Sequence, residues 1–103
     1  MPLTRDFKQT IQDRVQRDPE FREELFKEGV QCLLSGDVDT GKAILRDYIN
    51  ATLGFEHLSR EIQIPEKSIM RMLSESGNPS TNNMALILSY LNEYEGVTLK
   101  VSG

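Results

Sequence analysis

Side chains that build catalytic and metal sites are scarce in this sequence. Its 103 residues include no tryptophan, one cysteine and one histidine. Cys32 has no partner for an internal disulfide and no thiolate cluster around it, so a helical position in or near the core is the simplest interpretation. His57 has neither a second metal ligand nor a nucleophile at a useful spacing. We therefore expect no metal, no cofactor and no enzymatic activity.

Long hydrophobic runs are also absent. No stretch of about 18 apolar residues is present to cross a bilayer, and no apolar segment of the signal-peptide kind follows Met1. We expect a soluble, cytoplasmic protein without a membrane partner. A chain of 103 residues with 38% hydrophobic content indicates one domain, residues 1–103, with a single core.

Positive charge is in deficit. The chain has 12 Lys and Arg against 16 Asp and Glu, a formal net charge of −4. Domains that bind nucleic acids are usually basic, because the neutralisation of phosphates supplies much of their affinity. Any contact with DNA should therefore be local, or strengthened by a second chain.

Apolar residues at helical spacing recur along most of the sequence. Residues 4–17 carry a narrow apolar stripe, typical of a helix that packs on one partner. An aspartate–proline pair ends this helix and caps a second one, which runs to about Leu34. Gly36 and Gly54 bracket a third helix. The stripe of the first helix consists of Phe7, Ile11 and Val15.

The junction between the second and third helices contains a false phosphate-loop motif. Residues 36–42 fit the spacing G-x-x-x-x-G-K, but Ala43 stands where Ser or Thr must bind magnesium. Asp37 and Asp39 would also lie where the anionic phosphates bind. We therefore expect no nucleotide binding.

Two short helices separated by a tight turn form the most informative segment. The spacing of apolar residues predicts one helix from Phe55 to about Ile62 and another from Pro65, with Ile64 filling the angle between them. Glycine and proline within residues 74–79 terminate the second helix, the glycine supplying a left-handed residue. This is a helix-turn-helix pattern, which predicts sequence-specific DNA binding.

In such a motif the second helix enters the major groove. If its apolar residues point inward, helical geometry turns its polar residues outward. Lys67 and Arg71, four positions apart, suit phosphate or guanine contacts, and Glu66 could accept from cytosine. The alternative is a solvated helix with two ordinary surface cations. The predicted DNA-binding residues are Glu66, Lys67, Ser68, Met70 and Arg71.

The end of the chain is predicted to leave the helical pattern. A last helix from about Thr81 should stop at Gly96, and residues 97–101 alternate as in a β-strand. No other segment alternates in this way, so the strand should pair with a second copy or with another protein. A tail folded along the core is the alternative. The predicted interface residues are Val97, Leu99 and Val101.

The predicted fold is therefore an all-α domain of five to six helices that contains a helix-turn-helix. Residues 4–54 supply the N-terminal helices, residues 55–95 the helix-turn-helix core, and residues 97–101 a short C-terminal β-strand that pairs between chains.

Several short motifs between residues 18 and 101 carry a resemblance to a known family of small proteins. With them the chain resembles the addiction-module antidote proteins, antitoxins related to the HigA group that have a helix-turn-helix of the phage-repressor type. The leucine–serine motif at residues 58–59 and the Gly-Asn-Pro motif are the most specific. The motifs are Asp18-Pro19-Glu20, Ser35-Gly36-Asp37, residues 43–47, Leu58-Ser59-Arg60-Glu61, residues 64–74, Gly77-Asn78-Pro79 and Leu99-Lys100-Val101.

This resemblance implies binding to double-stranded operator DNA as a homodimer, repression of the protein's own operon, and neutralisation of a small basic toxin of the RelE/HigB ribonuclease superfamily. The chain departs from the repressor pattern at two positions. Gln63 stands where a turn glycine is common and is strained if the turn is left-handed. Ser59 replaces an alanine and needs an acceptor, commonly a backbone carbonyl one turn back. A protein-interaction module with little DNA affinity, or a phage-type regulator without a toxin, are the alternatives.

Overall fold

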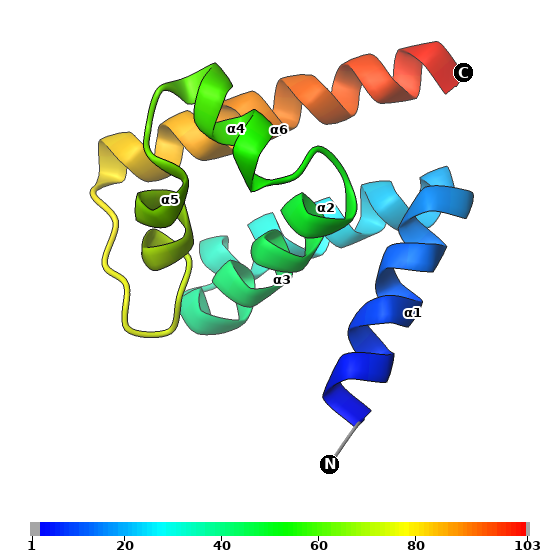
Figure 1. Cartoon of the computed structure of the whole chain (residues 1–103), viewed down its shortest axis with the longest axis horizontal. Helices are drawn as coiled ribbons and strands as arrows, with labels where there is room; N and C mark the ends of the chain where they lie inside the picture. Colours follow the sequence, from blue (N-terminus) through cyan, green and yellow to red (C-terminus); the bar gives the residue numbers. More distant parts are fainter. Residues whose placement is uncertain (1–2, 103) are drawn as a thin grey trace.

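Six α-helices make up the part of the chain that the structure describes (Figure 1). This computed structural model describes the backbone of residues 3–102 and the side chains of residues 10–96, and it contains no strand within that range. The all-α prediction is therefore confirmed. The helices are α1 (Leu3–Arg17), α2 (Pro19–Leu34), α3 (Val38–Ala51), α4 (Phe55–Ile62), α5 (Glu66–Met72) and α6 (Thr81–Ser102).

None of the described helices is both long and apolar enough to cross a bilayer.

The helix boundaries follow local stop and start signals. Asp18 separates α1 from α2, and its carboxylate accepts a hydrogen bond from the backbone N–H of Phe21 at 3.2 Å. This is the N-cap interaction that Asp supplies, and Pro19 occupies the first helical position, where a missing N–H costs nothing. Gly36 and Gly54 have φ values of 92° and 86°, which glycine adopts without strain and which end the preceding helical paths.

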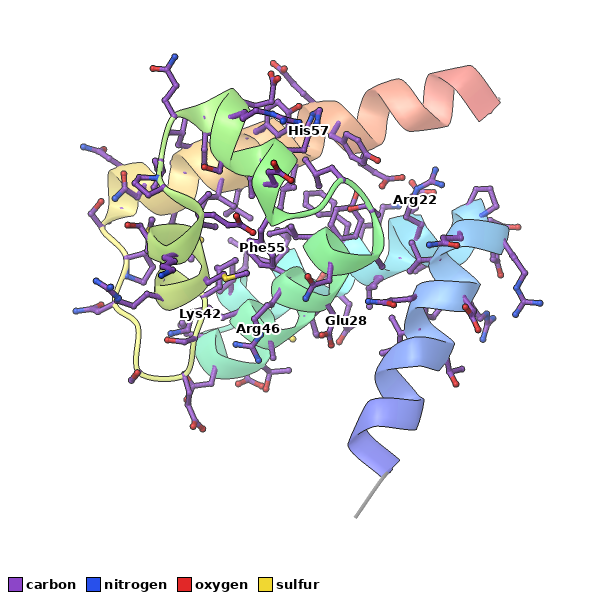
Figure 2. All side chains as sticks on the ribbon, in the orientation of Figure 1. Arg22, Glu28, Lys42, Arg46, Phe55 and His57 are labelled. Atoms are coloured by element: carbon purple, nitrogen blue, oxygen red, sulfur yellow. The ribbon has the colours of Figure 1, made fainter. Side chains whose placement is uncertain are left out.

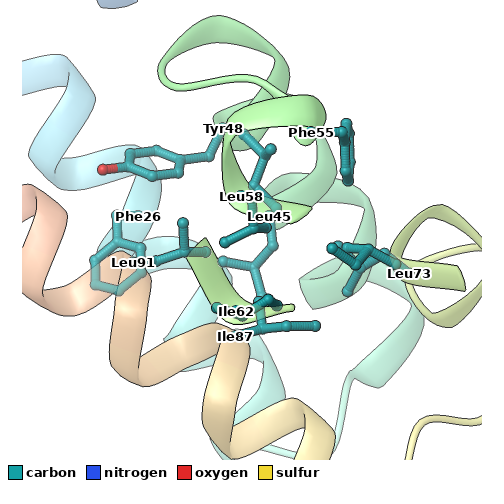
Figure 3. Packing of buried hydrophobic residues seen from close by; sticks show 11 residues of the cluster. Phe26, Leu45, Tyr48, Phe55, Leu58, Ile62, Leu73, Ile87 and Leu91 are labelled. Carbon is teal, nitrogen blue, oxygen red and sulfur yellow. The ribbon is translucent and has the colours of Figure 1, made fainter. Parts of the chain in front are cut away.

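The core consists of apolar side chains from the five helices α2, α3, α4, α5 and α6 (Figure 3). The helices α2 and α3 pack closely, because Gly41 of α3 lets the Leu33 side chain approach within 2.9 Å of the position that a Cβ atom would occupy. Val15 of α1 is also buried. The core cluster consists of Phe26, Leu45, Tyr48, Ile49, Phe55, Leu58, Ile62, Ile69, Leu73, Ile87 and Leu91.

A buried polar network joins three helices beside this core. The Arg22 guanidinium of α2 lies 3.2 Å from both carboxylate oxygens of Glu95 in α6. The Tyr48 hydroxyl of α3 donates a short hydrogen bond to the same carboxylate. Burial and the Glu95 carboxylate raise the pKa of Tyr48, so its hydroxyl remains a donor. Glu95 is only 3% exposed, and removal of either partner would leave its charge poorly compensated.

The predicted C-terminal strand is wrong. Helix α6 does not stop at Gly96 but continues through residues 97–101 to Ser102. A helix satisfies its backbone N–H and C=O groups within the segment, whereas a lone strand leaves them without partners in a single chain. The backbone hydrogen bonds of the helix therefore outweigh the preference for a strand that the alternation of residues 97–101 indicates. The side chains of Val97, Leu99 and Val101, the predicted pairing residues, lie outside the described ones.

The helical state of Gly96 can be tested by replacing it with alanine. No atom lies within 4 Å of the position of a Cβ atom there, so Gly96→Ala should raise the free energy of unfolding by about 0.5–1 kcal/mol through helix propensity. Urea unfolding followed by circular dichroism measures this change. Gly36→Ala is the control and should lower the stability, because Gly36 has a φ of 92°. A loss of stability in Gly96→Ala as well would contradict a continuous α6.

Candidate nucleic-acid interface

The short helices α4 and α5 follow one another with only Gln63, Ile64 and Pro65 between them (Figure 1). The inner face of α4 buries Phe55, Leu58 and Ile62, and α5 buries Ile69. Ile64 is partly buried against the same core, as its predicted place between the helices requires. The two helices are therefore held by one apolar cluster and present their remaining faces to solvent.

The turn between α4 and α5 has a strained conformation. Gln63 has φ 60° and ψ 41°, and within residues 3–102 no other non-glycine residue has a positive φ. The left-handed conformation on which the predicted strain depends is therefore present, and in this region Cβ lies close to backbone oxygen. The Gln63 N–H donates to the Ser59 carbonyl oxygen at 2.9 Å, which closes α4.

The acceptor of Ser59 is a backbone carbonyl, but not the expected one. The Ser59 hydroxyl donates to the carbonyl oxygen of Ile64, five residues ahead, at 2.6 Å. The left-handed residue Gln63 reverses the chain and places this carbonyl group beside α4. The bond therefore links α4 to the turn, a role that an alanine at this position could not fill.

Two cations from α3 contact the end of α5 and the segment that follows it. The Lys42 ammonium donates to the carbonyl oxygen of Gly77 at 2.9 Å, and the Arg46 guanidinium donates to that of Leu73 at 2.9 Å (Figure 2). Leu73 is the C-cap residue of α5, where free carbonyl groups and the helix dipole favour a positive charge. Lys42, the lysine of the false phosphate-loop motif, is only 3% exposed. Its bond to Gly77 gives this buried ammonium a partner inside the protein.

Gly77 permits a close approach of the chain to α5. A Cβ atom at this position would overlap the carbonyl oxygen of Arg71. The prediction that Gly77 supplies a left-handed residue is wrong, since the glycines with positive φ among the described residues are Gly36 and Gly54. Glycine is needed at position 77 because there is no room for a Cβ atom, and not because the backbone has a positive φ.

Lys42, Arg46 and Gly77 were not predicted as supports of α5. A signal for the two cations exists in the sequence: on α3, Lys42 lies three positions before buried Leu45, and Arg46 lies three positions before buried Ile49. Cations beside the apolar face of a helix need buried acceptors. Which acceptors they find depends on the path of residues 73–80, which the spacing does not reveal.

The outward face of α5 carries the predicted DNA-binding residues. Glu66, Lys67, Met70 and Arg71 are exposed and Ser68 is half-exposed, while Ile69 and Leu73 are buried. Met70 is 41% exposed, which is unusual for a large apolar side chain in this protein. The helix therefore presents two cations, one acid and one apolar side chain on a single accessible surface.

Lys67 and Arg71 differ from the other cations in one respect. Among the Lys and Arg side chains that the structure describes, these two have no ion pair or hydrogen bond within the chain. The others are engaged, for example Arg60 with Glu56 at 3.8 Å and Lys27 with Glu23 at 3.1 Å. The positive charge of α5 is therefore available to a ligand.

The single histidine and cysteine are placed apart from this face. His57 Nε2 lies 3.2 Å from the Tyr90 hydroxyl, which joins α4 to α6. Cys32 is half-buried on α2, and loss of hydration together with Glu28 raises the pKa of its thiol. Each side chain contacts another residue of the chain, His57 with Tyr90 and Cys32 with Glu28.

No protein-family model matches the chain, and no curated protein or solved structure shows significant similarity to it.

The strain at Gln63 can be relieved by glycine. Gln63→Gly should raise the free energy of unfolding by about 0.5–1 kcal/mol, because removal of the left-handed penalty exceeds the entropy that glycine adds to the unfolded chain. Gln63→Ala keeps the Cβ atom and should bring no gain. Thermal and urea unfolding of the two variants measure the difference, and equal stability of both would show that the turn stores no strain.

Proposed function

We propose that the protein is a DNA-binding antitoxin and transcriptional autorepressor without enzymatic activity. In this proposal α4, the turn and α5 act as a helix-turn-helix, and α5 enters the major groove of double-stranded operator DNA. The observation that carries it is the pair of unpartnered cations, Lys67 and Arg71, on the exposed face of α5. They can contact DNA without first breaking an ion pair inside the protein.

Each residue of this face has a chemical role in the proposal. Lys67 and Arg71 contact phosphates or guanine O6 and N7, and Glu66 accepts from cytosine N4. Ser68 reaches a phosphate or a base edge. Met70 offers an apolar contact of the kind that thymine methyl groups make.

The support of α5 favours a role that needs fixed geometry. Its C-terminal end is held by Arg46, the segment after it by Lys42, and the turn before it by Ser59. Base edges are discriminated by hydrogen bonds with narrow distance limits, so a recognition helix must keep its position. These three anchors use side chains outside α5, which leaves the outward residues of the helix free for DNA.

The acidic balance of the chain shapes the rest of the proposal. A net charge of −4 disfavours tight binding of one copy to DNA, so the active form is a homodimer that engages two half-sites. The same charge favours a basic protein partner. Together with the resemblance to antidote proteins, it supports neutralisation of a small basic toxin of the RelE/HigB kind.

The second candidate is a protein-interaction module that has this helical arrangement but little affinity for DNA. The net charge of −4 is the observation that favours it. A phage-type regulator without a toxin would differ from the leading proposal only in its protein partner.

Salt dependence of DNA binding separates the first two functions. Full-length protein should bind DNA from upstream of its own gene, with affinity that falls steeply from about 50 to 200 mM salt. Arg71→Ala should weaken binding by about 1–3 kcal/mol and reduce the slope of log affinity against log salt by about 1 for each chain. Fluorescence anisotropy with labelled duplexes measures both.

Arg17→Ala is the matched control for this experiment. Arg17 is an exposed cation at the end of α1, and its guanidinium donates to the Asp13 carbonyl oxygen at 3.3 Å. The variant has the same change in net charge at a position far along the chain from α5 and should bind DNA like the unaltered protein. Absence of any binding to upstream DNA at low salt would refute the leading proposal.

The antitoxin role predicts a protein partner encoded beside the gene. A small basic protein from the neighbouring reading frame should co-purify with this chain after co-expression, and its toxicity should disappear. Arg71→Ala should still co-purify if toxin binding and DNA binding use separate surfaces. Toxicity that persists despite equal expression of both proteins would rule out the antitoxin role but not DNA binding.

A further inference from the structure

A third cation without an acidic partner lies at α5, although it belongs to another helix. Within residues 10–96, the Lys and Arg side chains that form no ion pair with a carboxylate are Arg17, Arg46, Lys67 and Arg71. Lys67 and Arg71 lie on α5, and Arg46 reaches the end of α5 from α3 (Figure 2). Most of the unpaired positive charge in this part of the chain is therefore gathered at one short helix.

Arg46 uses only part of its guanidinium inside the protein. Its Nη1 donates to the carbonyl oxygen of Leu73 at 2.9 Å, and its Nε and Nη2 have no partner within the chain. Among the described side chains, the buried nitrogen without a hydrogen bond is Nη2 of Arg22, so the unused nitrogens of Arg46 reach solvent. Nε and Nη2 form one edge of the planar group, the fork that binds two oxygens of a phosphate in parallel.

The C-terminal end of α5 would repel an anion without this side chain. Free carbonyl groups and the helix dipole give the end of a helix a partial negative charge, and Leu73 is the C-cap residue of α5. Two acids lie near in the sequence, Asp47 beside Arg46 and Glu75 beyond Leu73, but neither pairs with the guanidinium. The full charge of Arg46 therefore outweighs the partial charge of the helix end.

The length of α5 places this end near the edge of a major groove, an argument that rests on the proposed function. Seven residues form a helix about 10 Å long, and the major groove is about 12 Å wide. In a helix-turn-helix, the N-terminal residues of the second helix contact the base edges. The opposite end then lies toward the phosphates that border the groove, where Arg46 is held by its bond to Leu73.

We propose that Arg46 is a phosphate-binding residue of the DNA interface, supplied by α3 from outside the helix-turn-helix. Its Nη1 stays on the Leu73 carbonyl oxygen while Nε and Nη2 donate to a phosphate of each half-site. Phosphate contacts fix the position and orientation of a protein on DNA without reading its sequence. One side chain thus joins the end of α5 to the DNA backbone and sets how the helix lies in the groove.

Arg46→Gln tests the contact, because it removes the charge and the fork. Binding should weaken by about tenfold or more, and to a similar extent for a duplex from upstream of the gene and for an unrelated duplex. The slope of log affinity against log salt should fall by about 1 for each chain. Fluorescence anisotropy with both duplexes measures these changes. A residue that only supports α5 would instead affect the upstream duplex most, because displaced base contacts lose sequence preference.

Arg17→Gln is the matched control. Arg17 also has no ion pair and also donates to a backbone carbonyl oxygen, that of Asp13 at 3.3 Å. The substitution makes the same change in net charge, so any general effect of charge appears in both variants. Arg17→Gln should leave the salt slope unchanged.

A duplex with one uncharged methylphosphonate locates the contact. At one position in each half-site, this change should weaken binding of the unaltered protein about as much as Arg46→Gln does. It should have little further effect on Arg46→Gln, because two changes that remove the same contact are not additive. Arg71→Ala should remain sensitive to the methylphosphonate at this position.

Arg46→Lys gives a second variant that keeps the charge. It should retain the salt slope, and the methylphosphonate should cost it less than it costs the unaltered protein, because an ammonium cannot bind a phosphate through a fork. Circular dichroism establishes that each variant is folded. If Arg46→Gln does not fold, the methylphosphonate comparison between Arg46→Lys and the unaltered protein decides.

Separate outcomes distinguish this inference from the proposed function. DNA binding with an unchanged salt slope in Arg46→Gln would overturn the phosphate contact and leave the DNA-binding role in place. A loss of affinity confined to the upstream duplex, or equal sensitivity of Arg46→Lys and the unaltered protein at every methylphosphonate, would do the same. An unaltered protein that binds neither duplex at low salt would refute the DNA-binding role, and the phosphate contact with it.

Discussion

Lys42 and Arg46, together with the apolar cluster that α5 shares with α4, fix the position of α5. Both reach from α3 to backbone carbonyl oxygens at and beyond the end of α5. A buried ammonium such as that of Lys42 is costly unless it is well bonded, so the path of residues 73–80 is constrained to supply acceptors. The same path brings Gly77 close to the backbone of Arg71. Ile69 and Leu73 are buried beneath it. The orientation of the candidate DNA-binding face is thus determined by the apolar cluster that α5 shares with α4 and by these two contacts from α3.

The sequence predicts helix positions well because their signals are local. Asp18 and the glycines at 36 and 54 act on their own neighbours, and apolar spacing places α4 and α5 correctly. The predictions that failed depend on distant parts of the chain. The alternation of residues 97–101 indicates a strand only if a partner exists, and α6 continues instead. Likewise, the acceptor of Lys42 lies 35 residues away, in a segment whose course local patterns do not determine. The acceptor of Ser59 is only five residues away, and it depends on the left-handed turn at Gln63.

The inward and outward residues of α5 could be derived from spacing alone, because a helix of known phase has only one apolar side. Spacing also distinguishes the cations that are already engaged. Arg60 and Lys27 each follow a glutamate by four positions and pair with it, whereas Lys67 follows Gln63 by four. A net charge of −4 therefore conceals a local excess of available positive charge on α5.

The anchors of α5 act on main-chain carbonyl groups and on inward-facing side chains. The outward positions 66, 67, 70 and 71 take no part in holding the helix, so their identities can change with little consequence for folding. Mutation can alter the ligand preference of such a surface in small steps while the scaffold stays intact. The same separation makes this chain a convenient frame for directed evolution, with randomisation confined to four exposed codons.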